Sequence, residues 1–254
     1  MNFNKKYLKM DLSKIKHTQG ISAISSVFTN FLRLSKYLNL EPIYPEFILS
    51  GYHNYGKPTM FIEYINLPDN VKIESECNST DENTLIWKVE NEWMLSDNFY
   101  QQYKDKIQKM KFLNFSIKKQ FEILGKKIID TFKRPICCVH VRRNDYLNIR
   151  NSLKLSTMPS AILSKIESLE KNISTVYIMT DETDPTFFDL IKTKYNVKLY
   201  VDIAELEQLK KEDNYKLFLV ETYIRDMSDL RISTFKSSRN NYYNTYLDEI
   251  EGWQ

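Results

Sequence analysis

The sequence predicts an α/β protein built on parallel sheets, and two observations carry this prediction. First, an apolar run over 135–139 is typical of a strand buried on both faces, which occurs mainly in parallel sheets covered by helices. Second, strands and helices alternate along the second half of the chain, which is the order that assembles a parallel sheet. The 254 residues suffice for one large domain or two small ones with a substantial core.

The first half is predicted to run β-α-β. A short strand over 6–12 precedes a helix over 20–39, whose apolar residues recur near helical spacing. A second short strand, 42–45, is bounded by prolines. Residues 46–110 show little periodicity. A helix over 112–132 is expected to lead into the buried strand.

The second half is predicted to alternate more regularly. Its further strands are expected at 176–180, 197–201 and 230–233. Asp184 followed by Pro185 favours a helix start, because Asp caps a helix and Pro fits its first position. The helix that follows is expected to bury Phe187, Phe188, Ile191 and Tyr195. Two more helices are expected, one over 214–227 and one that begins with the stretch 234–238.

Composition excludes several classes of protein. Lys and Arg number 36 against 33 Asp and Glu, and with no basic patch we expect no nucleic-acid partner. No apolar run approaches the ~20 residues of a membrane span, and no signal-peptide pattern is present, so no integral membrane segment and a cytoplasmic location are expected. The three cysteines do not form a disulfide framework.

Glycine is scarce, and this limits how the chain can bind phosphate. Only five glycines are present, and no GxGxxG motif is found among them. The nearest approach to a P-loop, Gly51 to Gly56-Lys57, is followed by Pro58 where Ser or Thr is needed. Any phosphate must therefore be held by side chains and helix N-termini.

Two arginines follow the buried strand at its carboxyl end, where open parallel sheets bind ligands. Guanidinium groups in that place indicate an anion, and Arg grips phosphate or carboxylate bidentately. Because adjacent strand residues point to opposite faces, Arg142 is predicted to face the ligand with His140, and Arg143 to pair with Asp145. The alternative is a surface ion pair at a strand end.

Three segments in order resemble the GDP-fucose-dependent fucosyltransferases, the superfamily of the alpha-1,2 and alpha-1,6 enzymes and the protein O-fucosyltransferases. The first, His140-Val141-Arg142-Arg143-Asn144-Asp145, resembles the family's HxRRxD peptide. The second is Val176-Tyr177-Ile178-Met179-Thr180-Asp181 with the acidic turn after it, and the third runs from Met227-Ser228-Asp229 to Ser233-Thr234-Phe235-Lys236-Ser237-Ser238. These two resemble the alpha-1,6 branch, and the likeness covers about residues 130–245.

The resemblance implies a GT-B-like fold, with two Rossmann-like halves whose parallel sheets face a cleft. The halves would be an acceptor-side domain over 1–130 and a GDP-sugar-binding domain over 131–239, with a helix or tail over 240–254. The implied activity is inverting transfer of fucose from GDP-fucose to a glycan or protein hydroxyl, without cofactor or metal. The absence of an Asp-x-Asp motif agrees with metal independence.

Two alternatives remain open. One is a transferase that uses another nucleotide sugar. The other is a non-catalytic nucleotide-sugar or glycan-binding relative, because Thr18-Gln19-Gly20-Ile21-Ser22 stands where the family has a Gly-rich loop.

The resemblance also assigns residues. Arg142 would contact the β-phosphate and stabilise the charge that develops on departing GDP. The remaining donor-binding set is His140, Arg143, Asp181, Glu221, Ser233, Thr234, Phe235, Ser237 and Ser238. Asp145 is a candidate general base, and His53 and Asn54 are candidates for the acceptor side.

Several of these donor residues also have a simpler interpretation. His140 would be a satisfied core histidine, Glu221 a carboxylate on a solvated helix face, and the Ser and Thr residues helix caps. The acidic turn after Thr180 is two residues longer than the family's Thr-Asp-Asp-Pro, and Lys236 interrupts the family's Thr-Phe-Ser-Ser pattern.

Overall fold

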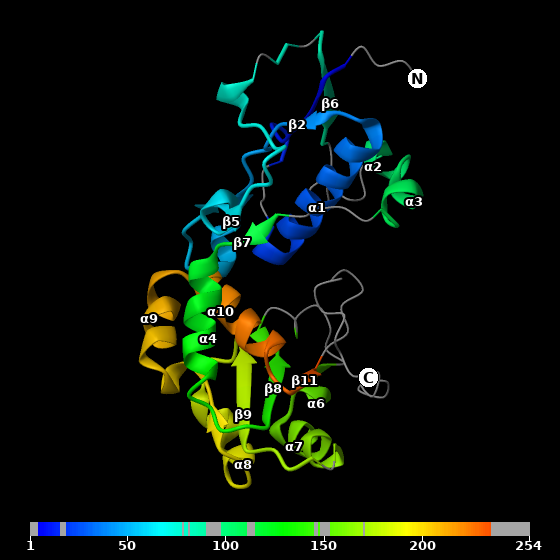
Figure 1. Ribbon diagram of the computed structural model, residues 1–254. Coiled ribbons are helices and arrows are strands. Elements are labelled where there is room, and N and C mark those ends of the chain that lie inside the picture. Colours follow the sequence, from blue (N-terminus) through cyan, green and yellow to red (C-terminus); the bar gives the residue numbers. More distant parts are fainter. Residues whose placement is uncertain are drawn as a thin grey trace. The chain divides into compact units, whose positions relative to one another are not determined.

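The computed structural model describes residues 5–15, 19–77, 79–80, 82–89, 98–110, 115–144, 147, 153–169 and 171–234. The chain divides into two compact units, Met1–Lys118 and Lys119–Gln254 (Figure 1). The boundary expected at residue 130 falls at the far end of helix α4 (Lys119–Ile129). This helix packs against α10 (Asn214–Asp226), so it belongs to the second unit.

The first unit is built on a parallel sheet of three strands. Their order is β2 (Glu41–Pro42), β1 (Tyr7–Asp11), β6 (Thr84–Lys88), and both neighbouring pairs are parallel. The strand predicted over 6–12 is confirmed as β1, whereas β6 lies in the stretch where no strand was predicted. The predicted first helix is confirmed as α1 (Ile21–Leu38), and Asn39 ends it at a φ of 55°.

Aromatic side chains form the core of the first unit. Phe28, on the buried face of α1, is fully buried and has its ring centroid 5.3 Å from that of Phe115. Four more rings lie within 6.4 Å of it, those of Phe31, Tyr44, Phe47 and Phe61. Aromatic side chains bury large areas, and edge-to-face pairs add further stabilisation. Residues 46–110, which show little periodicity in the sequence, therefore contribute aromatic side chains to the core around α1.

Short elements complete the first unit. Two antiparallel pairs are present, β3 (Ile48–Leu49) with β4 (Thr59–Met60) and β5 (Ile65–Asn66) with β7 (Ser116–Ile117). The short helical segments are η1 (Gly51–His53), η2 (Phe61–Glu63), η3 (Glu74–Glu76), α2 (Asn98–Gln101) and α3 (Lys104–Ile107). The helix predicted over 112–132 is wrong at its start, since β7 precedes α4.

The second unit contains a parallel sheet of four strands in the order β10-β9-β8-β11. Their bounds are Val197–Lys198 for β10, Thr175–Thr180 for β9, Ile136–Val141 for β8 and Leu230–Ser233 for β11. All six residues of β8 are buried, which confirms the buried strand predicted from the apolar run. At the other end of the sheet, Asp229 accepts from Ile136 N at 2.7 Å and from the Arg134 guanidinium at 2.6 Å.

Helices cover both faces of this sheet. One face carries α4 and α10, which lie together in Figure 1, and α10 contacts β8. The other face packs Cys137, Val139 and Val141 against buried residues of α7 (Pro159–Ser168) and α8 (Asp189–Lys192). The remaining elements are α6 (Leu153–Ser156), η5 (Pro185–Phe188), η6 (Tyr200–Asp202) and α9 (Ala204–Glu212).

The helix start predicted at Asp184 is confirmed, but the helix that follows is broken. Asp184 Oδ1 accepts from Thr186 N at 2.9 Å and caps η5, which then passes into α8. Of the four residues expected inside, Phe188 and Ile191 are fully buried, while Phe187 and Tyr195 are partly buried. The strand expected over 197–201 is shorter than predicted, because η6 begins at Tyr200.

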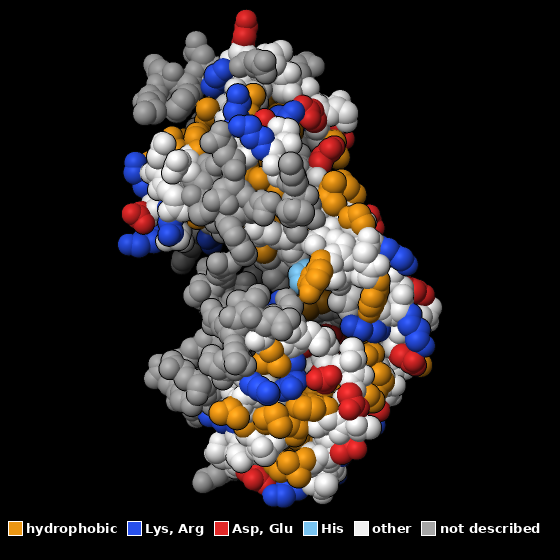
Figure 2. Space-filling model, turned by 180° about the vertical axis from the view of Figure 1, so that it is seen from behind, with side chains coloured by type: hydrophobic (Ala, Val, Ile, Leu, Met, Phe, Trp, Pro, Cys, Tyr) orange, Lys and Arg blue, Asp and Glu red, His pale blue; other side chains and the backbone are white. Residues whose placement is uncertain are grey.

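Charged side chains of both signs are interspersed on the face shown in Figure 2, with apolar side chains among them. This distribution fits the small net charge of +3. Among the helices of the described ranges, none is both long and apolar enough to cross a bilayer.

Candidate functional site

Three neighbouring strands of the second unit end at one edge of their sheet. The register pairs Val141 of β8 with Thr180 of β9, and His140 of β8 with Ser233 of β11. From β8 the chain continues outward through β9 and β10, and later returns on the other side as β11. The carboxyl ends of β8 and β11 therefore flank a topological switch point, the place where open parallel sheets bind ligands.

The end of β11 is tied to β8 at this switch point. Thr234 donates to the carbonyl oxygen of His140 through its N–H at 3.1 Å and through its hydroxyl at 3.3 Å. Its own carbonyl oxygen accepts from the Ser156 hydroxyl at 3.3 Å. Ser233 and Thr234 are both fully buried. Two of the predicted donor residues thus lie beside the end of β8, whereas Phe235, Ser237 and Ser238 lie outside the described residues.

His140 lies on the α10 face of β8 and is kept neutral. Burial lowers the pKa of its imidazole to about 3, and the positive charges of Arg225 and Arg142 add to this effect. The imidazole is 7% exposed. Arg142, two residues further on, is partly buried and lies close enough for its charge to act on this ring. A neutral imidazole can donate from one nitrogen and accept at the other, which suits contact with a polar ring.

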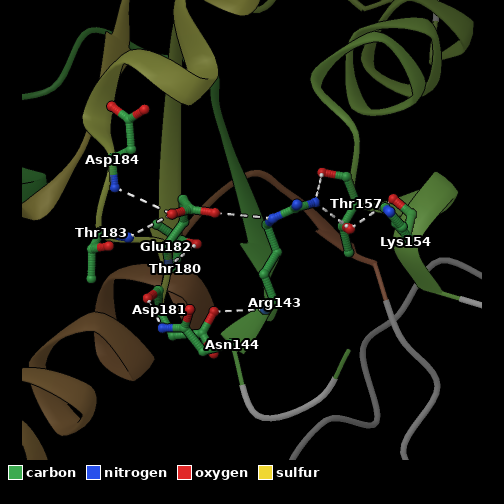
Figure 3. A network of polar contacts seen from close by, with 9 residues as sticks. All are labelled: Arg143, Asn144, Lys154, Thr157, Thr180, Asp181, Glu182, Thr183 and Asp184. Atoms are coloured by element: carbon green, nitrogen blue, oxygen red, sulfur yellow. Dashed lines mark hydrogen bonds and ion pairs between the residues drawn. The ribbon is translucent and has the colours of Figure 1, made fainter. Parts of the chain in front are cut away.

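Arg143 faces the opposite side, where its guanidinium is surrounded by partners (Figure 3). Its Nε donates to Glu182 Oε2 at 3.0 Å, and its Nη1 donates to the hydroxyl of Thr157 at 2.7 Å. Its Cζ lies 4.2 Å from the centroid of the Phe187 ring, at cation–π distance. The ion pair of Arg143 is therefore made with Glu182, which the sequence did not predict, and Asp145 lies outside the described residues.

The acidic turn after β9, residues 181–184, contacts the arginine segment directly. Asp181 Oδ1 accepts from the backbone N–H of Arg143 at 2.7 Å, and the Asp181 carbonyl oxygen accepts from the Asn144 side chain. Asp181 was predicted to bind the donor. The structure places it beside β8, with one carboxylate oxygen accepting from the chain that carries the arginines.

Glu221 is buried, so its assignment to a solvated helix face is wrong. It is 4% exposed on α10, and its Oε1 accepts from the Tyr177 hydroxyl at 2.7 Å. Burial raises the pKa of Glu221 to about 7, while the bond from Tyr177 and the charge of Lys210 lower it. Contact with guanine stays a prediction for this carboxylate.

The buried carboxylate gives a measurable pH dependence. Its pKa is about 7 in the folded protein against 4.5 in the unfolded chain, so the folded protein binds more protons between these values. Stability contributed by Glu221 is therefore gained as the pH falls through 7, and it is largest near pH 4.5. We expect the wild type to gain on the order of 2 kcal/mol of unfolding free energy over Glu221→Gln between pH 8 and pH 5.

Chemical denaturation of both proteins at pH 5, 6, 7 and 8 measures this difference. Titration of His140 is common to the two chains, so it cancels in the comparison. A difference in unfolding free energy that stays constant over this range would contradict the raised pKa.

The two candidates on the acceptor side differ in exposure. Asn54 is 1% exposed, and its side chain donates to the carbonyl oxygen of Lys57 at 3.2 Å, so it supports the loop from within. His53 is partly buried and packs against Gly20, where an added Cβ would lie 3.2 Å from the imidazole. Its neighbour Tyr52 is 77% exposed and contacts the imidazole edge to face. Contact of His53 or Asn54 with an acceptor stays a prediction.

Sequence reasoning missed several residues of this site. Arg225 is 4% exposed on α10, bonds to Asp226 at 2.7 Å, and acts on His140 through its charge. Its place on the buried stripe of α10, four residues after Glu221, was the available signal. Thr157 and Phe187 gave no such signal, because they reach Arg143 only through the folding of distant segments.

Comparison with known proteins shows a shared fold. Neither the models of known protein families nor the curated proteins contain a match. Solved structures do match: POFUT1 in complex with GDP has a TM-score of 0.53 and 12% identity, covering 92% of this chain and 92% of that chain. NodZ alpha-1,6-fucosyltransferase soaked with GDP-fucose has a TM-score of 0.54 and 11% identity, covering 92% and 90%. POFUT1 in complex with GDP-fucose has a TM-score of 0.51 and 11% identity, covering 92% of each chain.

These solved structures are fucosyltransferases by their names, so the chain has the α/β fold of such enzymes, with parallel sheets. At 11–12% identity the likeness concerns the fold.

Proposed function

We propose that this chain is a glycosyltransferase that moves fucose from GDP-fucose to a hydroxyl group of a glycan or protein. The observation that carries the proposal is the meeting of β8 and β11 at the switch point, where Ser233 pairs with His140 and Thr234 donates to the His140 carbonyl oxygen. Arg142 follows two residues after His140 and acts on its imidazole through its charge. Support comes from the fold, which POFUT1 and NodZ share and whose solved structures were obtained with GDP or GDP-fucose. Support also comes from the HxRRxD peptide at the end of β8.

The proposed reaction is inverting and needs no metal. The bond between the fucose carbon and the β-phosphate oxygen breaks, and its electron pair leaves with GDP. The acceptor oxygen attacks the same carbon from the opposite face and loses its proton to a base, for which we propose Asp145. The guanidinium of Arg142 stabilises the charge that develops on the phosphate, more strongly in the transition state than in the bound donor.

Donor binding is assigned to the second unit and the acceptor to the first, as in a GT-B protein of two Rossmann-like halves. Ser233, with Phe235, Ser237 and Ser238 after it, is proposed to hold the diphosphate through hydroxyl and backbone N–H groups, while Thr234, whose N–H and hydroxyl donate to His140, ties this segment to β8. His140 and Glu221 are proposed to face the guanine. A carboxylate accepts from guanine N1–H and N2–H together. Of the acceptor-side candidates, we retain His53.

Calorimetric titration of the full chain with GDP, GMP, UDP and ADP tests the donor assignment. We expect GDP to bind most tightly, and GMP at least tenfold more weakly because it lacks the β-phosphate that Arg142 contacts. Preference for UDP would remove guanine as the base. Equal affinity for GMP and GDP would remove Arg142 as a contact of the β-phosphate.

A mass-spectrometric transfer assay with GDP-fucose and a glycan library tests the activity. A product heavier by one fucose residue, formed together with GDP, is the expected result. Binding of GDP without turnover on any acceptor would instead favour a non-catalytic relative. Turnover of a different GDP-sugar would change the donor assignment.

A further inference from the structure

The acidic turn over 181–184, which contains the predicted donor residue Asp181, lies at the carboxyl edge of the sheet. Asp181 and Glu182 of this turn both accept hydrogen bonds from the arginine segment (Figure 3). We propose that Asp181 and Glu182 are positioning residues that set the direction of Arg142 by holding Arg143. This inference deepens the proposed function and rests on it.

The first step concerns the backbone. The N–H of Arg143 donates to Asp181 Oδ1 at 2.7 Å, and the side chain of Asn144 donates to the Asp181 carbonyl oxygen. β8 ends at Val141, so the chain that follows is outside the ladder of the sheet. Asp181 therefore fixes the two residues directly after Arg142, at a place where strand pairing no longer does so.

The second step concerns the guanidinium of Arg143. It donates to Glu182 at 3.0 Å and to the Thr157 hydroxyl at 2.7 Å, and it lies 4.2 Å from the Phe187 ring. The side chains of Arg143 and Glu182 are only 13% and 17% exposed. Because the guanidinium of Arg143 is buried and hydrogen-bonded, it has little rotational freedom. Its positive charge is balanced by the Glu182 carboxylate.

The Glu182 carboxylate is itself held by the backbone of the turn. Glu182 Oε1 accepts from the backbone N–H groups of Thr183 at 2.9 Å and Asp184 at 3.2 Å, while Oε2 accepts from Arg143. The N–H of Glu182 donates to the Thr180 hydroxyl at 3.0 Å. The backbone N–H groups of the turn thus hold the Glu182 carboxylate in place. Both oxygens of Glu182 accept within the protein, so this carboxylate is committed to the turn and to Arg143.

The fixed position of Arg143 constrains the position of Arg142, its neighbour in the chain. Arg143 lies on the α7 and η5 side of the sheet, in line with Cys137, Val139 and Val141. Arg142 acts through its charge on His140, which lies on the α10 side of the sheet, so the two arginines are directed to opposite sides. Holding Arg143 on its side of the sheet therefore keeps the Arg142 side chain directed to the other side. Glu182 would therefore act on the diphosphate without touching it.

Two measurements on Glu182→Ala, Glu182→Gln and Asp181→Ala test the proposal. Hydrogen–deuterium exchange of the peptide over 136–144 reports on the arginine segment without any ligand, and calorimetry with GDP reports on the site. Glu205→Ala is the matched control, since it removes an exposed ion pair with Lys127 elsewhere in the same unit. We expect faster exchange in the peptide, and GDP binding about tenfold weaker, for both alanine variants but not for the control. The Glu182→Gln variant, which keeps an accepting oxygen, should lie between them and the wild type.

The double variant Arg142→Ala/Glu182→Ala separates positioning from direct contact. If Glu182 acts through Arg142, then Glu182→Ala causes no further loss of GDP affinity once Arg142 is absent. Additive losses would mean a separate contact with the donor and would overturn the proposal. So would unchanged exchange and unchanged affinity in the single variants. If the wild-type protein binds no GDP, the proposed function fails, and the exchange experiment alone decides whether Asp181 and Glu182 hold the segment.

Discussion

Replacing Arg142 with alanine is expected to lower the turnover of GDP-fucose by about 10²- to 10³-fold, the range measured when one preorganised donor to a transition-state charge is removed. Arg142 is partly buried and directly follows Val141, the last residue of β8. The glycine-poor chain has no phosphate-binding glycine loop, so few other groups can take over this task. Initial rates of GDP release at saturating acceptor measure the effect.

Two further variants sharpen this experiment. Arg142→Lys keeps the positive charge but loses the bidentate fork, so we expect a rate between those of Arg142→Ala and the wild type. Arg231→Ala is the matched control, because Arg231 lies on β11 of the same sheet and contacts the Asp226 carbonyl oxygen at 3.3 Å. Its turnover should stay within twofold of the wild type. Turnover near the wild-type rate in Arg142→Ala, with GDP binding intact, would remove Arg142 from the reaction.

The second large effect is expected in the first unit, where Phe28→Ala should lower the free energy of unfolding by about 3–5 kcal/mol. Phe28 is fully buried, and all five rings around it belong to the first unit. Truncation removes apolar area and also leaves a cavity that rigid aromatic neighbours fill poorly. Hydrogen–deuterium exchange should accelerate in α1 and β1, while α10 of the second unit stays protected.

The control for this prediction is Phe28→Leu, which keeps most of the volume and should cost about 1 kcal/mol. Equal losses in the two variants would show that volume is not what Phe28 contributes. Equal acceleration of exchange in α10 would show that the two units unfold together.

Strands could be predicted from the sequence where their buried residues follow a regular pattern. β8 is buried at every position and flanked by charge, so its limits were visible in the sequence. In β6 the buried residues are Thr84 and Trp87, which do not alternate with exposed ones, and no strand pattern results. Helix α9 has one buried residue, Leu206, so its apolar stripe was too thin to recognise. Helix α7 was also not predicted, although it buries Ile162, Leu163 and Ile166 at the spacing typical of an amphipathic helix.

At the site, local geometry could be predicted better than partners. Alternation along a strand was enough to expect Arg142 and Arg143 on opposite sides. The partner of Arg143 was not accessible in the same way, because Glu182 and Thr157 lie far from it in sequence and reach it only through the shape of the turn. The partner of Glu221 was likewise hidden, since a single Glu on a helix gives no sign of the Tyr177 hydroxyl that faces it.

The pairing of β1 has a consequence for biosynthesis. β1 begins at Tyr7, and its longest partner is β6, which begins at Thr84 and sits at the opposite edge from β2. A chain growing on the ribosome exposes Leu8 and Met10 early, long before the residues of β6 have been made. Until then these apolar side chains and one edge of the strand have no permanent neighbour, which is the condition under which nascent chains aggregate. The first unit is therefore expected to complete its sheet only after β6 has been made, and to expose this edge of β1 until then.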